Sequence, residues 1–144
     1  MRKAILGLAL TAGLLGCGSP NPNLAFQQRW ENQQINDYRF TLEARCFCPK
    51  ERVDPVRVEV RGGQPVSLVY ADSGAPPGRA YWDNENTIDK LFAIIQANAG
   101  KPGVRLEVTY DAALSYPARV LLDPVAGAVD DEVTYVVSSF ERLP

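Results

Sequence analysis

Histidine is absent from this chain of 144 residues. The imidazole side chain is the commonest general base in enzymes and the commonest neutral metal ligand. Its absence excludes Ser-His-Asp and Cys-His catalysis, and the sequence contains no glycine-rich phosphate loop or nucleotide-binding fingerprint. We therefore expect a protein that is not an enzyme and that binds neither a metal nor a cofactor.

The chain lacks an excess of basic over acidic residues, and it lacks a long hydrophobic run. The chain has 15 Lys and Arg against 17 Asp and Glu. Because nucleic-acid binding depends on clustered Lys and Arg, we expect no nucleic-acid partner. The apolar run near the start of the chain extends only from Ala4 to Leu15, whereas a membrane-spanning helix needs roughly 20 apolar residues.

The start of the chain instead has the features of a targeting signal. A basic start, Met1–Lys3, leads into the apolar run, which ends at Leu14-Leu15-Gly16-Cys17. This ending resembles the lipobox of bacterial lipoproteins, and the resemblance implies that residues 1–16 are removed and that Cys17 is lipidated. An ordinary secretory signal is the alternative, but it would more often end in an Ala-x-Ala-like step, which is missing.

Lipidation would fix the location of the protein. Lipid on Cys17 would hold it outside the cytoplasm on a bacterial membrane. Gly18, rather than Asp, follows Cys17, which points to the outer membrane where the cell has two membranes. Residues 17–23 then form a polar tether, and residues 24–144 are long enough for a single domain with its own core.

Hydrophobic periodicity predicts two helices. The first spans Leu24–Asn36 and carries Trp30 inward. The second begins after Asn86 or Thr87, either of which can cap it. Its inward stripe recurs at i, i+3, i+4 and i+7 and consists of Ile88, Leu91, Phe92 and Ile95.

Alternation of apolar and polar residues predicts six strands. Tyr38–Cys48 alternates most clearly, although Phe47 interrupts the polar positions. The other five segments are Val56–Val60, Val66–Tyr70, Val104–Tyr110, Pro117–Leu122 and Val133–Val137. Short turns favour antiparallel pairing. We therefore predict an α+β fold of two α-β-β-β units, with one antiparallel sheet of about six strands and two helices on one of its faces.

Side-chain parity also selects a turn after Val60. A two-residue Gly62-Gly63 turn would pair Val60 with Pro65 and mix the apolar and polar faces. A three-residue loop, residues 62–64, pairs Val60 with Val66 and keeps the faces separate. We therefore expect the three-residue loop.

With Cys17 assigned to lipid, Cys46 and Cys48 remain as a Cys-x-Cys pair. Outside the cytoplasm such a pair is expected to be oxidised. Two residues of extended strand span roughly 6.6 Å, close to the limit of about 6.8 Å for the Cα atoms of a disulfide, so a strand end or bulge would ease the bond. We expect a local structural disulfide. A redox-active pair and a metal site are the alternatives, although two sulfurs without His lack the usual four metal ligands.

Two surfaces are candidates for binding. Strand parity places charged residues on the open face of the sheet, as either an ordinary solvated face or a docking face for another envelope protein or cell-wall polymer. These residues are Arg39, Glu43, Arg45, Arg57, Glu59, Arg61, Arg105 and Glu107. Tyr81 and Trp82, beside a loop rich in Pro and Gly, are candidates for an exposed aromatic anchor; alternatively, Trp82 packs over the second helix.

The combination of motifs resembles a known family. A Trp-containing first helix leads into further motifs at Asp37–Leu42, Cys46–Pro49, Pro55–Val60, Thr87–Phe92, Val108–Asp111, Tyr116-Pro117 and Asp131–Val133. Over about residues 26–141, these motifs are similar to a family of small bacterial envelope lipoproteins classed as a domain of unknown function. The resemblance implies a fold and a location, and it offers no activity or catalytic residues.

Together these observations lead to a first hypothesis: a lipid-anchored envelope protein that binds or scaffolds another component without catalysis. Its partners would be the membrane, through Cys17, and an envelope protein or cell-wall polymer. The alternatives are a thiol–disulfide redox protein that uses Cys46 and Cys48 and, by analogy of fold alone, an inhibitor of a secreted enzyme.

Overall fold

A computed structural model describes residues 21–77 and 81–144 of the chain. The predicted signal peptide, residues 1–16, and the predicted lipidation site Cys17 lie outside the described residues. Within the described part, three helices and six strands follow one another along the chain. They are α1 (Pro22–Glu31), β1 (Tyr38–Cys46), α2 (Lys50–Val53), β2 (Val56–Arg61), β3 (Gln64–Tyr70), α3 (Ile88–Asn98), β4 (Arg105–Tyr110), β5 (Pro117–Asp123) and β6 (Val133–Arg142).

These strands form one open antiparallel sheet in the order β3-β2-β1-β6-β5-β4. The predicted α+β fold of two α-β-β-β units is therefore confirmed. The first unit places its first strand at the centre of the sheet, whereas the second unit places its last strand there. β1 and β6 pair from Tyr38 opposite Arg142 to Cys46 opposite Val133, so the two ends of the domain meet in the middle of the sheet.

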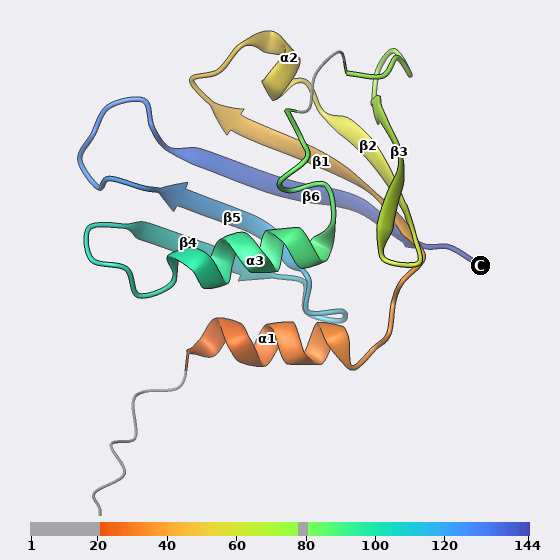
Figure 1. The fold of residues 1–144 in the computed structure, drawn as a ribbon, viewed down its shortest axis with the longest axis horizontal. Coiled ribbons are helices and arrows are strands. Elements are labelled where there is room, and N and C mark those ends of the chain that lie inside the picture. The colour runs from red at the N-terminus through yellow and green to blue at the C-terminus, as the bar shows by residue number, and fades with distance from the viewer. Residues whose placement is uncertain (1–20, 78–80) are drawn as a thin grey trace, which may run out of the picture.

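Helices α1 and α3 cover one face of the sheet (Figure 1). Trp30 of α1 makes edge contacts with the rings of Tyr38, Tyr116 and Phe140, at centroid distances of 5.7, 6.3 and 5.8 Å. Its indole N–H donates to Asp89 of α3 at 2.9 Å. One aromatic side chain therefore joins both helices to the sheet.

Helix α3 lies where the spacing of apolar residues predicted the second helix. The predicted stripe of Ile88, Leu91, Phe92 and Ile95 is buried against the sheet. Thr87 caps the helix, because its hydroxyl oxygen accepts the Lys90 N–H at 3.1 Å. The capping residue is therefore Thr87 rather than Asn86.

Helix α1 is shorter than the predicted Leu24–Asn36. It begins at Pro22, a residue favoured at the first helical position because the N–H that it lacks would have no partner there. It ends at Glu31, and the chain then turns toward β1 through Gln34, whose φ is 51°. Helical spacing of apolar residues alone did not mark this turn.

A short helix and an earlier strand end were not predicted. Helix α2, Lys50–Val53, follows Pro49 and is too short to give a periodic signal. β1 ends at Cys46 rather than at Cys48, since the chain leaves the sheet where the two cysteines meet.

The predicted three-residue loop after β2 is wrong. Gly62 and Gly63, with φ of 55° and 75°, form a two-residue turn that fits the hairpin type with two positive φ angles. Val60 lies opposite Pro65, and a bulge then accommodates Val66 as an extra residue. Parity selected the wrong turn because this bulge restores the face of the strand beyond it, where Leu68 lies opposite Val58 as expected.

The turn gives a test of the fold. Nothing lies within 4 Å of a Cβ built on Gly63, so a substitution there meets backbone strain and no clash. We expect Gly63→Val to lower the free energy of unfolding by about 1–2 kcal/mol, the cost of a left-handed residue with a branched side chain. Gly63→Asn is the matched control, because Asn tolerates this region. Equal urea midpoints for the two variants would contradict the assigned turn.

Candidate functional site

The charged residues predicted for the open face lie on strands whose opposite face forms the core. Along β1, Arg39 and Glu43 alternate with the buried residues Phe40, Leu42 and Ala44. Their side chains therefore leave the sheet on the side that α1 and α3 do not cover.

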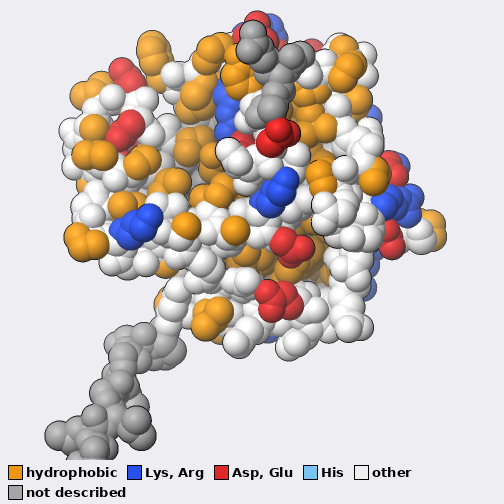
Figure 2. Space-filling view, in the orientation of Figure 1, with side chains coloured by type: hydrophobic (Ala, Val, Ile, Leu, Met, Phe, Trp, Pro, Cys, Tyr) orange, Lys and Arg blue, Asp and Glu red, His pale blue; other side chains and the backbone are white. Residues whose placement is uncertain are grey.

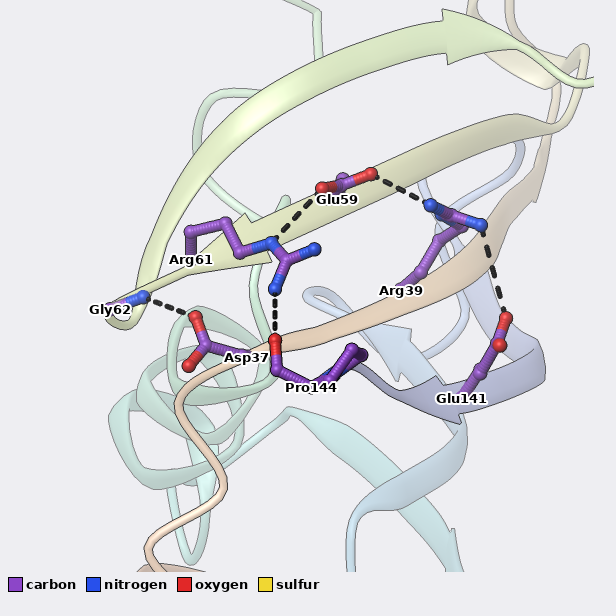
Figure 3. Close-up of polar contacts among 7 residues, drawn as sticks. All are labelled: Asp37, Arg39, Glu59, Arg61, Gly62, Glu141 and Pro144. Carbon is purple, nitrogen blue, oxygen red and sulfur yellow. Dashed lines mark hydrogen bonds and ion pairs between the residues drawn. The ribbon is translucent and has the colours of Figure 1, made fainter.

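Most of these charges are paired with one another. Figure 3 shows Glu59 between two guanidinium groups, with Arg39 at 2.9 Å and Arg61 at 3.1 Å. Arg39 also approaches Glu141 at 3.9 Å, and Arg61 donates to the carbonyl oxygen of Pro144 at 2.7 Å. The two arginines hold the pKa of the Glu59 carboxyl below its usual range.

The remaining charges form separate pairs. Arg45 bonds Glu43 at 2.8 Å on β1, and Arg105 bonds Glu107 at 2.7 Å on β4. β6 and β5 lie between these two strands. Within residues 21–77 and 81–144, Arg57 makes no ion pair. The open face therefore carries several self-neutralised groups rather than one charged patch.

Trp82 is not an exposed anchor, and that expectation is wrong for this residue. Its side chain is only 1% exposed, and the Arg52 guanidinium lies over the indole ring, 4.3 Å from its centroid. Tyr81 beside it is exposed. The stacking partner comes from α2, whose presence the sequence pattern did not reveal.

Arg52 also makes a buried ion pair with Glu85. The two side chains are 14% and 4% exposed, and Arg52 additionally approaches the Tyr135 hydroxyl at 3.4 Å. Burial raises the pKa of the Glu85 carboxyl, while the charge of Arg52 opposes that shift. This buried cluster joins α2, the segment before α3 and β6. Sequence reasoning missed it, because its members are far apart in the chain and follow no repeating pattern.

Trp82 also lines a groove of about 430 Å³ beside β3. One side of the groove is formed by β3, through Pro65, Val66, Ser67 and Leu68. The other side is formed by Pro76, Pro77, Trp82, Asp83 and Asn86. We call this feature the β3 groove.

β3 is an edge strand, and part of its backbone faces this groove. The N–H of Tyr70 donates to Ala75 at 2.8 Å and its carbonyl accepts from Gly74 at 2.9 Å, so Tyr70 turns its backbone groups away from β2. Backbone groups alternate in direction along an antiparallel strand. Two residues earlier, Leu68 therefore also turns its N–H and C=O outward, where it lines the groove.

Cys46 and Cys48 form a close pair at the end of β1. Their Cα atoms are 5.2 Å apart, and the structure joins the two sulfurs in a disulfide. So small a ring contributes only about 1.5 kcal/mol by the loop-entropy relation. The neighbouring cations Arg45 and Lys50 are each paired with a carboxylate, which reduces their capacity to stabilise a thiolate.

Two further observations concern the described residues alone. Residues 21–77 and 81–144 contain no group of three His, Cys, Asp or Glu side chains that could hold a metal ion. None of the helices in that part of the chain is long and apolar enough to cross a bilayer.

The fold and the β3 groove define a small α+β domain with an open antiparallel sheet and an accessible sheet edge. The chain belongs to the family of unknown function DUF6174, whose model matches residues 24–142. The match covers nearly all of the predicted domain. No curated protein and no solved structure matches the chain significantly.

The buried cluster behind the groove is testable. We expect Glu85→Gln to lower the free energy of unfolding by about 3 kcal/mol, because Arg52 is then left buried without its counter-charge. The double variant Arg52→Met with Glu85→Leu removes both charges and should lose less than Glu85→Gln alone. Urea unfolding measures both. A double variant less stable than the single one would show that the ion pair is not what limits stability here.

Proposed function

We propose that this protein is a lipid-anchored bacterial envelope protein whose domain binds an extended segment of another envelope protein along β3. The observation that carries the proposal is the outward backbone of Leu68 in the β3 groove. An extended peptide that adds to a sheet edge gains affinity from main-chain hydrogen bonds and specificity from the pockets beside it.

The far wall of the groove offers a polar group to such a segment. Asp83 lines this wall, and its carboxylate would accept hydrogen bonds from the N–H groups of a bound strand. Trp82 lines the wall as well, but its side chain is only 1% exposed, so it would support the wall and donate no hydrogen bond to the segment.

The accessible part of the edge is short. Pro65 has no N–H to offer at one end, and the turn through Gly74 and Ala75 occupies Tyr70 at the other. Among the residues that the structure describes, Val66–Leu68 lie open between them. Short edges of this kind limit aggregation, and they suit a small, transient interface rather than an obligate one.

The charged open face is less well supported as the docking surface. Except for Arg57, the arginines predicted for this face already bond Glu59, Glu43 or Glu107. A partner would have to displace these carboxylates or bind beside neutral pairs. Exposed ion pairs of this kind contribute little to stability or affinity, so the groove is the stronger candidate.

The anchoring half of the proposal rests on the Leu14–Cys17 motif. We expect the protein, expressed from its full sequence in a bacterium, to fractionate with membranes and to resist a high-salt wash. Cys17→Ser should move it out of that lipid-bound fraction. The double variant Cys46→Ser with Cys48→Ser is the matched control and should remain membrane-bound. Unchanged fractionation of Cys17→Ser would contradict lipid anchoring.

The binding half is tested by site-specific cross-linking in intact cells. A photoreactive residue at position 66 lies in the groove, and one at position 107 lies on the open face of the sheet; the side chains of Val66 and Glu107 are both exposed. We expect a discrete cross-linked protein from position 66 and none from position 107.

A backbone variant sharpens this experiment. Leu68→Pro removes the outward N–H without removing a bond to β2, since proline is tolerated on the open side of edge strands. It should reduce the cross-link from position 66 about fivefold, the effect of one lost hydrogen bond. Equal cross-linking from both positions, or an unchanged yield with Leu68→Pro, would contradict binding along β3.

A further inference from the structure

Two loops present strongly exposed hydrophobic side chains. Among the described residues, the most exposed large hydrophobic side chains are Phe47 at 84% and Val129 at 83%, and Val125 is 59% exposed. Phe47 stands between Cys46 and Cys48, and the two valines lie in the loop between β5 and β6. We call Phe47, Val125 and Val129 the apolar tip.

The two loops lie at the same end of the sheet. Cys46, the last residue of β1, pairs with Val133, the first residue of β6. Phe47 and Asp130 line one shallow depression of about 300 Å³. Figure 2 shows hydrophobic side chains over the β5–β6 loop, at the left of the molecule.

The chain enters the domain at this end as well. Asn21, which precedes α1, donates to Gln96 near the C-terminus of α3 at 2.9 Å. The loop after α3 joins the β5–β6 loop, because the Ala126 N–H donates to Gly103 at 2.8 Å. In Figure 1 the start of α1, the end of α3 and the β5–β6 loop all lie on the left side of the molecule.

A lipid on Cys17 would constrain this end to the membrane surface. Asn21 follows Cys17 by four residues, and four residues of fully extended chain reach at most about 14 Å. We propose that the apolar tip inserts into the interface of the bilayer to which Cys17 is anchored. This inference rests on the lipid anchoring proposed above, and it adds a second contact that orients the domain.

The chemistry of the tip fits a lipid surface. The Cys46–Cys48 ring restrains Phe47 before it meets the membrane, so little conformational freedom is lost on insertion. Amphipathic elements bury apolar side chains at the boundary between headgroups and acyl chains. An acyl anchor and such side chains act together, since stable attachment takes more than one signal.

The charges near the tip favour a zwitterionic surface. Asp130, Asp131 and Glu132 follow Val129 directly. The nearby cations Arg45 and Lys50 are paired with carboxylates. The tip therefore lacks the basic cluster that draws proteins to anionic lipids, and phosphatidylcholine is the appropriate test lipid.

The test uses the protein expressed from its full sequence in a bacterium and reconstituted in phosphatidylcholine vesicles, with and without brominated acyl chains. Phe47→Trp places a fluorescent reporter in the tip, while the native Trp30 and Trp82 are buried and give a constant background. We expect a blue-shifted emission that brominated lipid quenches. Val66→Trp, an exposed site in the β3 groove, is the matched control and should show neither effect.

A second reporter and two further measurements complete the test. Val129→Trp should reproduce the quenching if Phe47→Trp disturbs the disulfide ring. Protein that sediments with the vesicles while both tip reporters remain unquenched overturns this inference alone, leaving a protein partner for the tip. Protein that fails to sediment overturns lipid anchoring as well. Quenching that requires phosphatidylglycerol and is lost in salt would replace apolar insertion with electrostatic docking and overturn the proposal.

Discussion

The pairing of β1 with β6 at the centre of the sheet is the contact on which the remaining structure depends. These strands come from the two ends of the domain, so neither α-β-β-β unit can complete the sheet alone. The pairing also places Tyr38 and Phe140 in stacked contact beneath Trp30, at a centroid distance of 5.4 Å between the first two rings. Both helices are then held to the sheet through the aromatic side chain of α1.

A sheet centred on the chain ends leaves strands from the interior of the sequence at its edges. β3 and β4 are those edges. The β3 edge is bounded by Pro65 and by the turn at Gly74 and is open between them. The open face, by contrast, satisfies its own charges through pairs such as Arg39 with Glu59. Unused backbone hydrogen-bonding capacity is therefore found at the β3 edge, whereas most arginines of the charged face are already paired.

The features that could be predicted from the sequence are those with a repeating pattern. The stripe from Ile88 to Ile95 identified α3, and the alternation from Tyr38 to Ala44 identified β1 with its buried face. The bulge at Val66 could not be predicted from the alternation of apolar and polar residues. The extra residue shifts that alternation by one position, and the pattern on either side of the bulge still looks regular. The same limit applies to the site. Arg52 and Trp82 come together only through the tertiary fold, and an aromatic side chain in a loop offers no sign of whether it is stacked or exposed.

The Leu14–Cys17 motif bears on how the domain would lie on a membrane. Lipid on Cys17 would hold Asn21, four positions further along the chain, within about 14 Å of the anchored cysteine. The end of the sheet that bears Phe47 would then face the lipid, while the Gly62-Gly63 turn lies at the opposite ends of β2 and β3 from the Cys46–Cys48 pair. Between these ends, the β3 groove would then stay on the side of the domain, away from the bilayer. The two proposed contacts therefore use different parts of the sheet, and a protein oriented by its tip would present the groove to neighbouring envelope proteins.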